Sequence, residues 1–430
     1  MDSTAPADTP KEEKSSFEQE PENEVADSTE ATQITTAAGS EHSEEEHVSK
    51  FMLLDRLFRF LSQEDDDEPV NPVLAGYFSK VVCLLINRKQ KQIVPYIVDD
   101  ANKVVENLLK HVYSRSVAEV VHRLLHIVES NFEEELSVKI AEKKQIIMAS
   151  LIDQLNCTKE NETDLNAAFI LQDMMEQKPF FQILTKRQNM QKMYDIAFSP
   201  DGAADLQSKV TTQGLIARFV QQFNDRQKQD HDEDRWDNSG EDDDIIVNEV
   251  SDEENEDSKT NANAIIEQFM VQMVEPLKKI LDMAPLESVS SQLSTGRILP
   301  LGNTKLRAVE LLQSIVSLKK AAIITAVKDS GVMKTVLQLI ERHPWNNMIQ
   351  LKVHLIYQDV FNSEIEVADK LDFLRETEVT TALAKMAETP EVKFSSGNLI
   401  RNGFMGFVIQ LGNLICKQKA ANGTMETLEG

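Results

Sequence analysis

Two histidines, His122 and His126, stand one helical turn apart in the segment "VAEVVHRLLHIV". On a helix, this spacing places both imidazole rings on the same face, where they can ligate a metal ion. A metalloprotease helix also needs a glutamate directly after the first histidine, and Arg123 stands there instead. The alternative interpretation is two polar residues beside a buried apolar stripe. The sequence alone favours this alternative and predicts no metal site.

Other patterns that carry chemistry are missing from the chain. It contains no Gly-x-x-x-x-Gly-Lys-Ser/Thr loop, no Gly-x-Gly-x-x-Gly turn and no Gly-x-Ser-x-Gly elbow. The acidic run "EDDDIIVNEVSDEENED" lacks the glycine and the ligand spacing of an EF-hand calcium loop. We therefore expect no catalytic residues and no cofactor.

Two serines lie in an acidic context that suits phosphorylation. Ser239 and Ser251 are each followed by acidic residues at positions +2 and +3. This pattern is typical of substrates of an acidophilic kinase such as casein kinase 2, and phosphate would add negative charge to the segment. The alternative is two unmodified serines in a linker.

The net charge of −27 is concentrated in two segments. Residues 1–47 contain fourteen acidic and two basic side chains, and residues 225–258 contain sixteen and three. Segments with high like charge and few apolar residues do not bury enough surface to fold, so both are predicted to be disordered. The acidic balance also argues against a nucleic-acid partner, because phosphate contacts require a basic face.

Cysteine use and hydropathy indicate the compartment. Cys83, Cys157 and Cys416 are far apart, which fits neither a disulfide framework nor a zinc site and suits a reducing environment. The N-terminus "MDSTAPADTPKEEK" does not resemble a secretory signal, and apolar runs such as "VVCLLI" are too short to span a bilayer. We expect a cytoplasmic or nuclear protein without membrane insertion.

Helical periodicity dominates the rest of the chain. In "VAEVVHRLLHIV" the apolar residues recur at i, i+3, i+4, i+7, i+8 and i+11. The segment "NPVLAGYFSKVVCLLINRK" places on one face Val73, Leu74, Tyr77, Phe78, Val81, Val82 and Leu85, with Asn71 as the N-cap and Pro72 in the first turn. No window alternates with period two for long enough to form a sheet. The prediction is an all-α, HEAT/armadillo-like helical-repeat solenoid.

The composition divides this solenoid. Residues 48–224 and 259–418 are expected to be its N-terminal and C-terminal parts, separated by the acidic insertion 225–258. Residues 1–47 form an acidic tail, and residues 419–430 a flexible C-terminus. A boundary between two separate helical domains is the competing interpretation of 225–258.

Four segments, in order, resemble the SAPS-domain family, the regulatory subunits of type 6 (yeast Sit-type) serine/threonine protein phosphatases. They are "LLDRLFRFL" with "NPVLAGYFSKVVCLLINRKQKQIVPYI", then "LGNTKLRAVELLQSIV", "HPWNNMIQLKVHLI" and "NGFMGFVIQLGNLI". Together they span about residues 50–416. Relatives in the family often carry a long C-terminal extension.

The resemblance implies a helical-repeat protein that binds a phosphatase catalytic subunit and directs its substrate choice or location, without catalytic residues or a cofactor of its own. A third regulatory subunit is a further possible partner. Candidate partner-binding residues in the resembling segments are Asn71, Asn303, Lys305, Trp345, Asn346, Asn347 and Phe404. The alternative is a capping role for Asn71, Asn303 and Asn346, and a core position for Phe404. The alternative function is a generic helical scaffold for transport or assembly with no phosphatase partner.

The stretch "HPWNNMIQ" carries the most local detail. Pro344 predicts that the preceding helix stops before it. Asn346 or Asn347 is then expected to cap the next helix, which buries Ile349, Val353, Ile356 and Val360. Trp345 lies in the turn between the two helices, where it faces either the core or a partner.

Overall fold

The computed structural model describes residues 51–62, 69–157, 161–200, 205–237, 256–284, 291–293, 296–298, 300–393 and 397–421. The predicted tail 1–47, the serines Ser239 and Ser251, and residues 422–430 lie outside these ranges. Of the predicted acidic insertion, residues 238–255 lie outside them as well.

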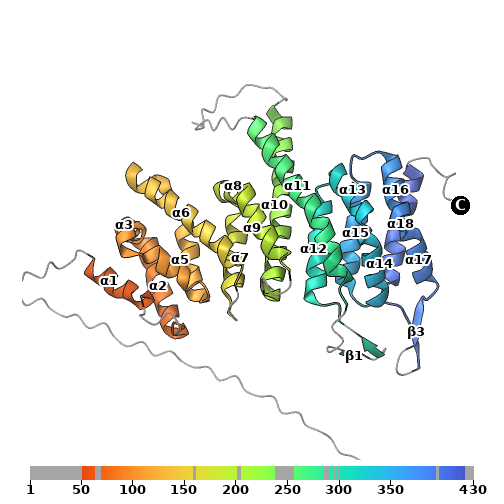
Figure 1. Ribbon diagram of the computed structural model, residues 1–430, viewed down its shortest axis with the longest axis horizontal. Coiled ribbons are helices and arrows are strands. Elements are labelled where there is room, and N and C mark those ends of the chain that lie inside the picture. Colours follow the sequence, from red (N-terminus) through yellow and green to blue (C-terminus); the bar gives the residue numbers. More distant parts are fainter. Residues whose placement is uncertain are drawn as a thin grey trace, which may run out of the picture. The chain divides into compact units, whose positions relative to one another are not determined.

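Eighteen α-helices account for most of the described residues (Figure 1). The first ten are α1 (Met52–Phe58), α2 (Pro72–Arg88), α3 (Gln90–Val98), α4 (Val104–Lys110), α5 (Arg115–Leu125), α6 (Glu134–Gln154), α7 (Thr163–Met174), α8 (Lys178–Thr185), α9 (Arg187–Ala197) and α10 (Leu206–Asp237). The others are α11 (Glu256–Asp282), α12 (Asn303–Val316), α13 (Ala321–Ser330), α14 (Val332–Arg342), α15 (Asn347–Phe361), α16 (Val367–Glu376), α17 (Val379–Ala387) and α18 (Met405–Ala421).

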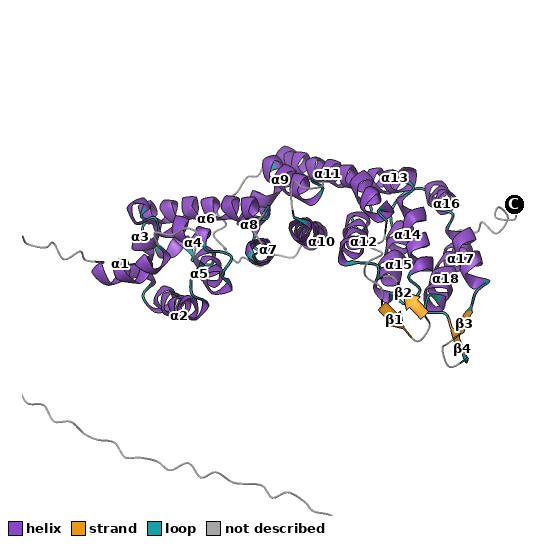
Figure 2. Ribbon diagram, turned by 60° about the horizontal axis from the view of Figure 1, so that its bottom comes forward, coloured by secondary structure: helices purple, strands orange, loops and turns teal. Residues whose placement is uncertain are grey.

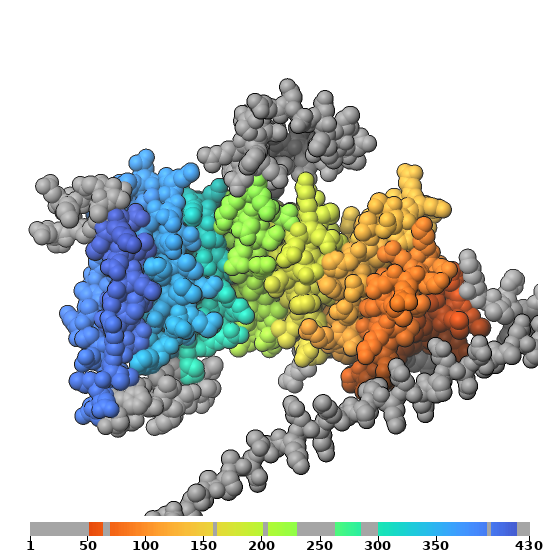
Figure 3. All heavy atoms as spheres, turned by 180° about the vertical axis from the view of Figure 1, so that it is seen from behind, coloured from red at the N-terminus to blue at the C-terminus, as the bar shows by residue number. Residues whose placement is uncertain are grey.

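These helices pack on near neighbours in the chain, as expected for a helical-repeat solenoid. We call α2, α5, α7, α10, α12, α15 and α18 the first layer, in which each helix contacts the next. Helices α6, α9, α11, α14 and α17 form a second layer, and each contacts at least one helix of the first. In Figure 2, α6, α9 and α11 lie along the upper edge, above α7, α10, α12 and α15, and in Figure 3 the colours run broadly from red to blue along the molecule. The prediction of an all-α, armadillo-like fold is confirmed.

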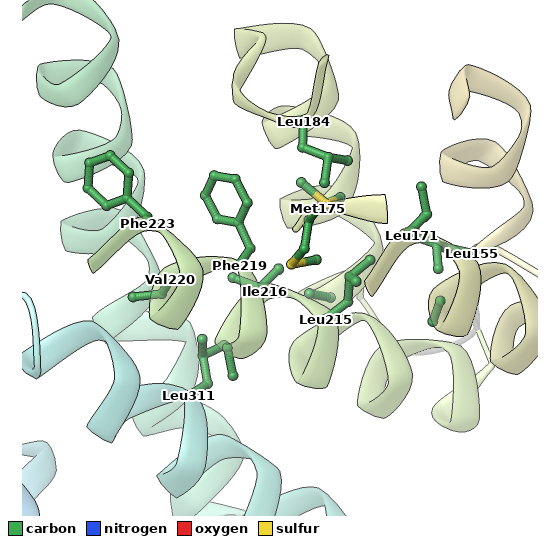
Figure 4. Close-up of a cluster of buried hydrophobic side chains, with 14 of the residues drawn as sticks. Leu155, Leu171, Met175, Leu184, Leu215, Ile216, Phe219, Val220, Phe223 and Leu311 are labelled. Atoms are coloured by element: carbon green, nitrogen blue, oxygen red, sulfur yellow. The ribbon is translucent and has the colours of Figure 1, made fainter. Parts of the chain in front are cut away.

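Helix α10 joins the helices before and after the acidic segment. Its buried side chains Ile216, Phe219 and Val220 lie between Leu171 and Met175 on one side and Leu311 of α12 on the other (Figure 4). Two hydrogen bonds fix the α10–α12 pair, from the Gln221 amide to the Ser314 hydroxyl (3.3 Å) and from the Asn224 amide to the Ser317 carbonyl (3.2 Å). The helices on both sides of residues 238–255 therefore belong to one stack.

Two of the helix starts predicted from capping residues agree with the structure. The Asn71 side-chain oxygen accepts the backbone N–H groups of Val73 (3.0 Å) and Leu74 (3.2 Å) at the start of α2. Helix α14 ends at Arg342, before Pro344, and the Asn346 oxygen accepts the Ile349 N–H (3.2 Å) at the start of α15. Each cap of this kind stabilises a helix by about 1 kcal/mol. The expected buried face of α15, with Ile349, Val353, Ile356 and Val360, is also found.

The expected buried face of α2 is only partly correct, because Phe78 and Val82 are buried but most of the other predicted residues are exposed. The helix buries Ala75, Phe78, Ser79, Val82 and Ile86. It exposes Val73, Leu74, Tyr77, Val81 and Leu84, at 45–63% of their surface. The sequence pattern misled because α2 is apolar around most of its circumference, so that two stripes compete and only contact with α5 selects the buried one.

Two short hairpins correct the expectation that the chain has no sheet. Strand β1 (Ser291–Leu293) pairs antiparallel with β2 (Gly296–Ile298), and β3 (Glu391–Lys393) pairs with β4 (Leu399–Arg401). Strands of three residues are too short to show period-two alternation. Strand β4 ends directly before Asn402–Gly403.

The helix bounds also differ from the predicted insertion. Helix α10 continues to Asp237 and α11 begins at Glu256, so both enter the segment 225–258 that was assigned to disordered chain. Helix α18 likewise runs to Ala421, past residue 418. A high density of charge does not by itself exclude a helix, because Glu, Lys and Arg are good helix formers. In the described residues, no helix has the length and apolarity that crossing a membrane requires.

Two aspartates are expected to respond oppositely to neutralisation. Burial raises the pKa of Asp359 above its ordinary value, although Lys319 opposes this. The Lys328 ammonium, 2.7 Å away, lowers the pKa of Asp372. Ionised Asp359 therefore costs stability above its unfolded pKa of about 4, whereas ionised Asp372 contributes stability there that is lost as the pH falls. In thermal melts at pH 7, Asp359→Asn should raise the midpoint and Asp372→Asn should lower it, with both differences shrinking below about pH 4. Shifts of the same sign would contradict this assignment.

Candidate partner-binding site

A surface pocket collects four of the seven predicted partner-binding residues. Its volume is about 560 Å³, and we call it the Trp345 pocket. It is lined by Pro300, Leu301, Gly302, Asn303, Leu306, His343, Trp345, Asn346, Asn347 and Met348. The N-terminal turns of α12 and α15 therefore form its wall. Trp345 is 40% exposed and Met348 57% exposed, so both present apolar surface to solvent.

Two contacts hold the turn that carries Trp345 in position. The Gln350 amide donates to the Pro344 carbonyl at 2.7 Å. Gly403, between β4 and α18, packs directly against the same turn: a Cβ atom at Gly403 would lie 2.4 Å from the Pro344 oxygen and 2.7 Å from Trp345 Cε3. The indole is therefore held in place by a backbone approach that only glycine permits.

A second pocket adjoins the first and shares Asn303 with it. It has a volume of about 500 Å³, and we call it the α10 pocket. Its walls come from α7, α10 and α12, with apolar surface from Leu165 and Phe169, which is 52% exposed. The Arg115 guanidinium lies 5.4 Å from the Phe169 ring centroid, at cation–π distance. The two pockets together extend from α7 to α15 in the first layer.

Charged side chains line the α10 pocket and are tied to one another. Arg307 forms an ion pair with Glu310, with 2.6 Å between nitrogen and oxygen, and Glu310 forms a second ion pair with Lys352 of α15 at 3.4 Å. Arg218 lies 3.5 Å from Glu176. Partly exposed ion pairs of this kind add little stability, but they hold polar groups at defined positions around an apolar surface. Apolar anchors with a polar rim are the usual anatomy of a protein interface.

Three predicted residues do not line these pockets. Asn71 caps α2. Phe404 is 3% exposed and lies in the core. The Lys305 ammonium donates to the Met283 carbonyl at 2.5 Å, beyond the last residue of α11, which is a helix-closing contact. Burial lowers the pKa of Lys305, with nearby Arg342 acting in the same direction and Asp282 opposing both.

The capping role suggested for Asn303 is wrong. The N-cap of α12 is Gly302, with φ of +86°, and Asn303 is the first helical residue, exposed in both pockets. Asn346 both caps α15 and lines the Trp345 pocket, so the capping role does not exclude the predicted partner-binding role. Asn347 is exposed at the first position of α15.

Two exposed apolar residues that line these pockets were not predicted from the sequence. Phe169 and Met348 were not singled out because each lies within a helix whose apolar pattern was assigned to the core. The available signal was an excess of apolar residues beyond one stripe, as in "NAAFILQ", where Ile170 and Leu171 are buried and Phe169 is not. More than half of the exposed large apolar side chains in the described ranges lie on first-layer helices.

The two histidines of α5 also acquire a third neighbour. Asp173 of α7 lies within hydrogen-bond distance of both His122 and His126. Spacing along α5 did not reveal it, because Asp173 belongs to a different helix.

Comparison with known families gives a match over most of the chain. The family model described as SIT4 phosphatase-associated protein (SAPS) matches residues 82–328 and 324–429. These ranges include both pockets.

Individual relatives agree with the family match. The chain is 24% identical over 428 residues to mouse serine/threonine-protein phosphatase 6 regulatory subunit 1, covering 92% of this chain and 46% of the relative. It is 22% identical over 431 residues to chicken serine/threonine-protein phosphatase 6 regulatory subunit 3, covering 92% and 45%. The chain thus spans about half the length of these relatives. Among solved structures, a computationally designed armadillo repeat protein for modular peptide recognition aligns with 12% identity and a TM-score of 0.37, covering 71% of this chain and 99% of that one.

Proposed function

Because the chain belongs to the SIT4 phosphatase-associated protein (SAPS) family, we propose that it is a regulatory subunit of a type 6 serine/threonine protein phosphatase. It binds the catalytic subunit and directs that subunit's choice of substrate or its location. Two relatives that match nearly the whole chain are named as serine/threonine-protein phosphatase 6 regulatory subunits, and this supports the proposal. The hydrolytic chemistry then belongs to the catalytic subunit, and this chain contributes binding surface.

The observation that carries the proposal is the run of two adjoining pockets on the first layer. Phe169, Trp345 and Met348 present apolar surface, and Asn303, where the pockets meet, presents an amide. Aromatic and other large apolar anchors in pockets, surrounded by polar groups, account for most of the affinity of protein interfaces. We place the catalytic subunit on this surface.

A repeat protein suits this role because its surface extends over several helices. The first layer presents side chains from α7, α10, α12 and α15 side by side, so that one bound protein can contact all of them. A bound catalytic subunit leaves other helices of the layer available for substrates or for a third subunit. Cell fractionation will test the expected cytoplasmic or nuclear location of the assembly.

Co-purification tests the proposal directly. The full chain and a type 6 catalytic subunit, co-expressed and separated by size exclusion, should elute together in a stoichiometric complex at physiological salt. A type 1 phosphatase catalytic subunit serves as the matched control and should elute alone. If the type 6 subunit also elutes alone, the chain is a helical scaffold for another assembly. Identification of the proteins that co-purify from native cells would then reveal its partner and would also detect a third subunit.

A further inference from the structure

Three side chains on the α5–α7 pair point their ligand atoms at one another. His122 lies in the last turn of α5, His126 is the C-cap residue that follows this helix, and Asp173 lies near the end of α7. The Nε2 atom of His122 is 2.8 Å from Asp173 Oδ2, and Nε2 of His126 is 3.3 Å from the same oxygen. The two Nε2 atoms are 3.2 Å apart. We call these residues the His–His–Asp cluster; the two pockets described above do not include them.

The distances match the ligand spacing of a tetrahedral metal ion. Zinc binds histidine nitrogen at about 2.0–2.1 Å and carboxylate oxygen at about 2.0–2.2 Å. Two ligands at that radius, on adjacent corners of a tetrahedron, are about 3.3–3.5 Å apart. Two of the three measured separations lie within about 0.2 Å of this range, and the third requires Asp173 to move outward by about half an ångström.

The residue behind His126 can set the protonation state that a metal requires. Both Nε2 atoms must be free of protons to bind an ion, so Nδ1 must carry the proton. Nδ1 of His126 lies 3.3 Å from the Gln177 amide nitrogen. Because the two amide atoms exchange places on rotation of the group, the Gln177 oxygen can accept the proton of Nδ1 instead. Metal-bound histidines usually have such a partner on the other nitrogen.

The cluster is accessible to an ion from solution. The side chains of His122, His126 and Asp173 are 20%, 37% and 43% exposed. Three protein ligands leave a fourth tetrahedral position open for water or for a group of a bound protein. Two imidazoles and a carboxylate suit zinc and neighbouring divalent transition metals better than magnesium or calcium, which prefer oxygen ligands alone.

We infer that His122, His126 and Asp173 form a binding site for one divalent transition-metal ion of the zinc class, which joins α5 to α7. This inference reverses the sequence-based expectation of no metal, and the reason is Asp173, which contributes the third ligand from α7. It is independent of the proposed phosphatase role. The competing interpretation is a metal-free cluster in which both imidazoles donate to the Asp173 carboxylate.

Metal titration distinguishes the two. The full chain, stripped with a chelator, is titrated with Zn²⁺ in competition with a chromogenic indicator, and with Co²⁺ to record visible absorption. We expect one site that His126→Gln and Asp173→Asn each weaken by at least about a hundredfold, since loss of an outer hydrogen-bond partner alone costs about 10–100-fold. His354→Gln, a histidine elsewhere in α15, is the matched control and should leave the site intact.

Thermal melting supplies a second readout that does not depend on the indicator. Zn²⁺ should raise the unfolding midpoint of the unmodified chain, and a chelator should reverse the rise, because an ion that binds only the folded state stabilises it. Both cluster variants should lose this response while remaining folded by circular dichroism. The inference is overturned if Zn²⁺ binding and the thermal response are the same in the cluster variants as in His354→Gln. It is also overturned if the dissociation constant for every ion tested is weaker than about 100 µM, since exposed histidines bind metal unspecifically at such concentrations.

Discussion

Substitution of Met348 by aspartate is expected to weaken binding of the phosphatase catalytic subunit by about thirtyfold or more, which corresponds to the roughly 2 kcal/mol typical of an interface hot spot. Met348 is 57% exposed on the wall of the Trp345 pocket. A carboxylate there must lose its hydration when a partner covers the pocket, which costs free energy unless the charge is paired. In the free chain the carboxylate remains in water, so the thermal midpoint should stay within about 1 °C of the unmodified protein.

Val138 provides the matched control for Met348. It is 54% exposed but lies on α6, in the second layer. Val138→Asp introduces the same charge at a similar exposure and should leave affinity unchanged in a titration calorimetry or surface-binding measurement. Equal losses for both variants would show that the effect is one of net charge and not of the Trp345 pocket.

Trp345→Ala complements this pair because it separates packing from binding. The indole is 40% exposed and otherwise rests on Gly403, so its removal should lower both affinity and, to a smaller extent, stability. Loss of the catalytic subunit with an unchanged melt would show that the turn acts purely as an interface. Survival of both properties would remove Trp345 from the proposed site.

The second large effect is expected at Gly403. Gly403→Ala should destabilise the chain by about 1–3 kcal/mol, the usual cost of adding a methyl group where there is no space. The added Cβ would meet the Pro344 carbonyl oxygen at 2.4 Å, and because this neighbour is backbone it cannot rotate away. The turn must therefore shift and take Trp345 with it. Chemical denaturation should report the loss of stability, and Trp345 fluorescence should report the altered position of the indole.

Gly406, three residues further on, makes the comparison specific. A Cβ atom at Gly406 meets nothing within 4 Å, and the residue lies inside α18. Gly406→Ala should therefore stabilise the chain by up to about 1 kcal/mol, because alanine favours the helix more than glycine does. If both alanine variants change stability in the same direction, the close approach at Gly403 does not constrain the turn.

Local chemistry made much of the helical architecture predictable from the sequence. Asn71 and Asn346 were identified as caps because a short side-chain oxygen before an apolar stripe satisfies the first free N–H groups of a helix. The end of α14 followed from Pro344. These features depend on a few consecutive residues, so packing against distant parts of the chain does not alter them.

Features that depend on contacts between distant residues were not predictable. Which stripe of α2 is buried is decided by α5, and the sequence of α2 alone contains two equivalent choices. Phe404 was assigned either a contact or a core position and lies in the core, whereas Phe169 was overlooked and lies in the α10 pocket. Asp173 becomes a neighbour of His122 only through the packing of α7 on α5. In this chain, the sequence therefore predicted where helices begin, but not which residues of each helix would be exposed at a candidate site.

The near-neighbour contacts of the first layer also bear on how the chain folds during synthesis. Because each helix packs on one that emerged shortly before it, α2 to α9 can assemble on the ribosome before α12 exists. Contacts of short sequence separation also favour rapid folding, since little loop entropy is lost before they form. Helix α10 is the exception, because Leu311, Ser314 and Ser317 of the α12 region must wait for synthesis of the whole acidic segment. One face of α10 therefore remains uncovered for that interval, and translation pauses there would prolong the exposure of Val220 and its neighbours.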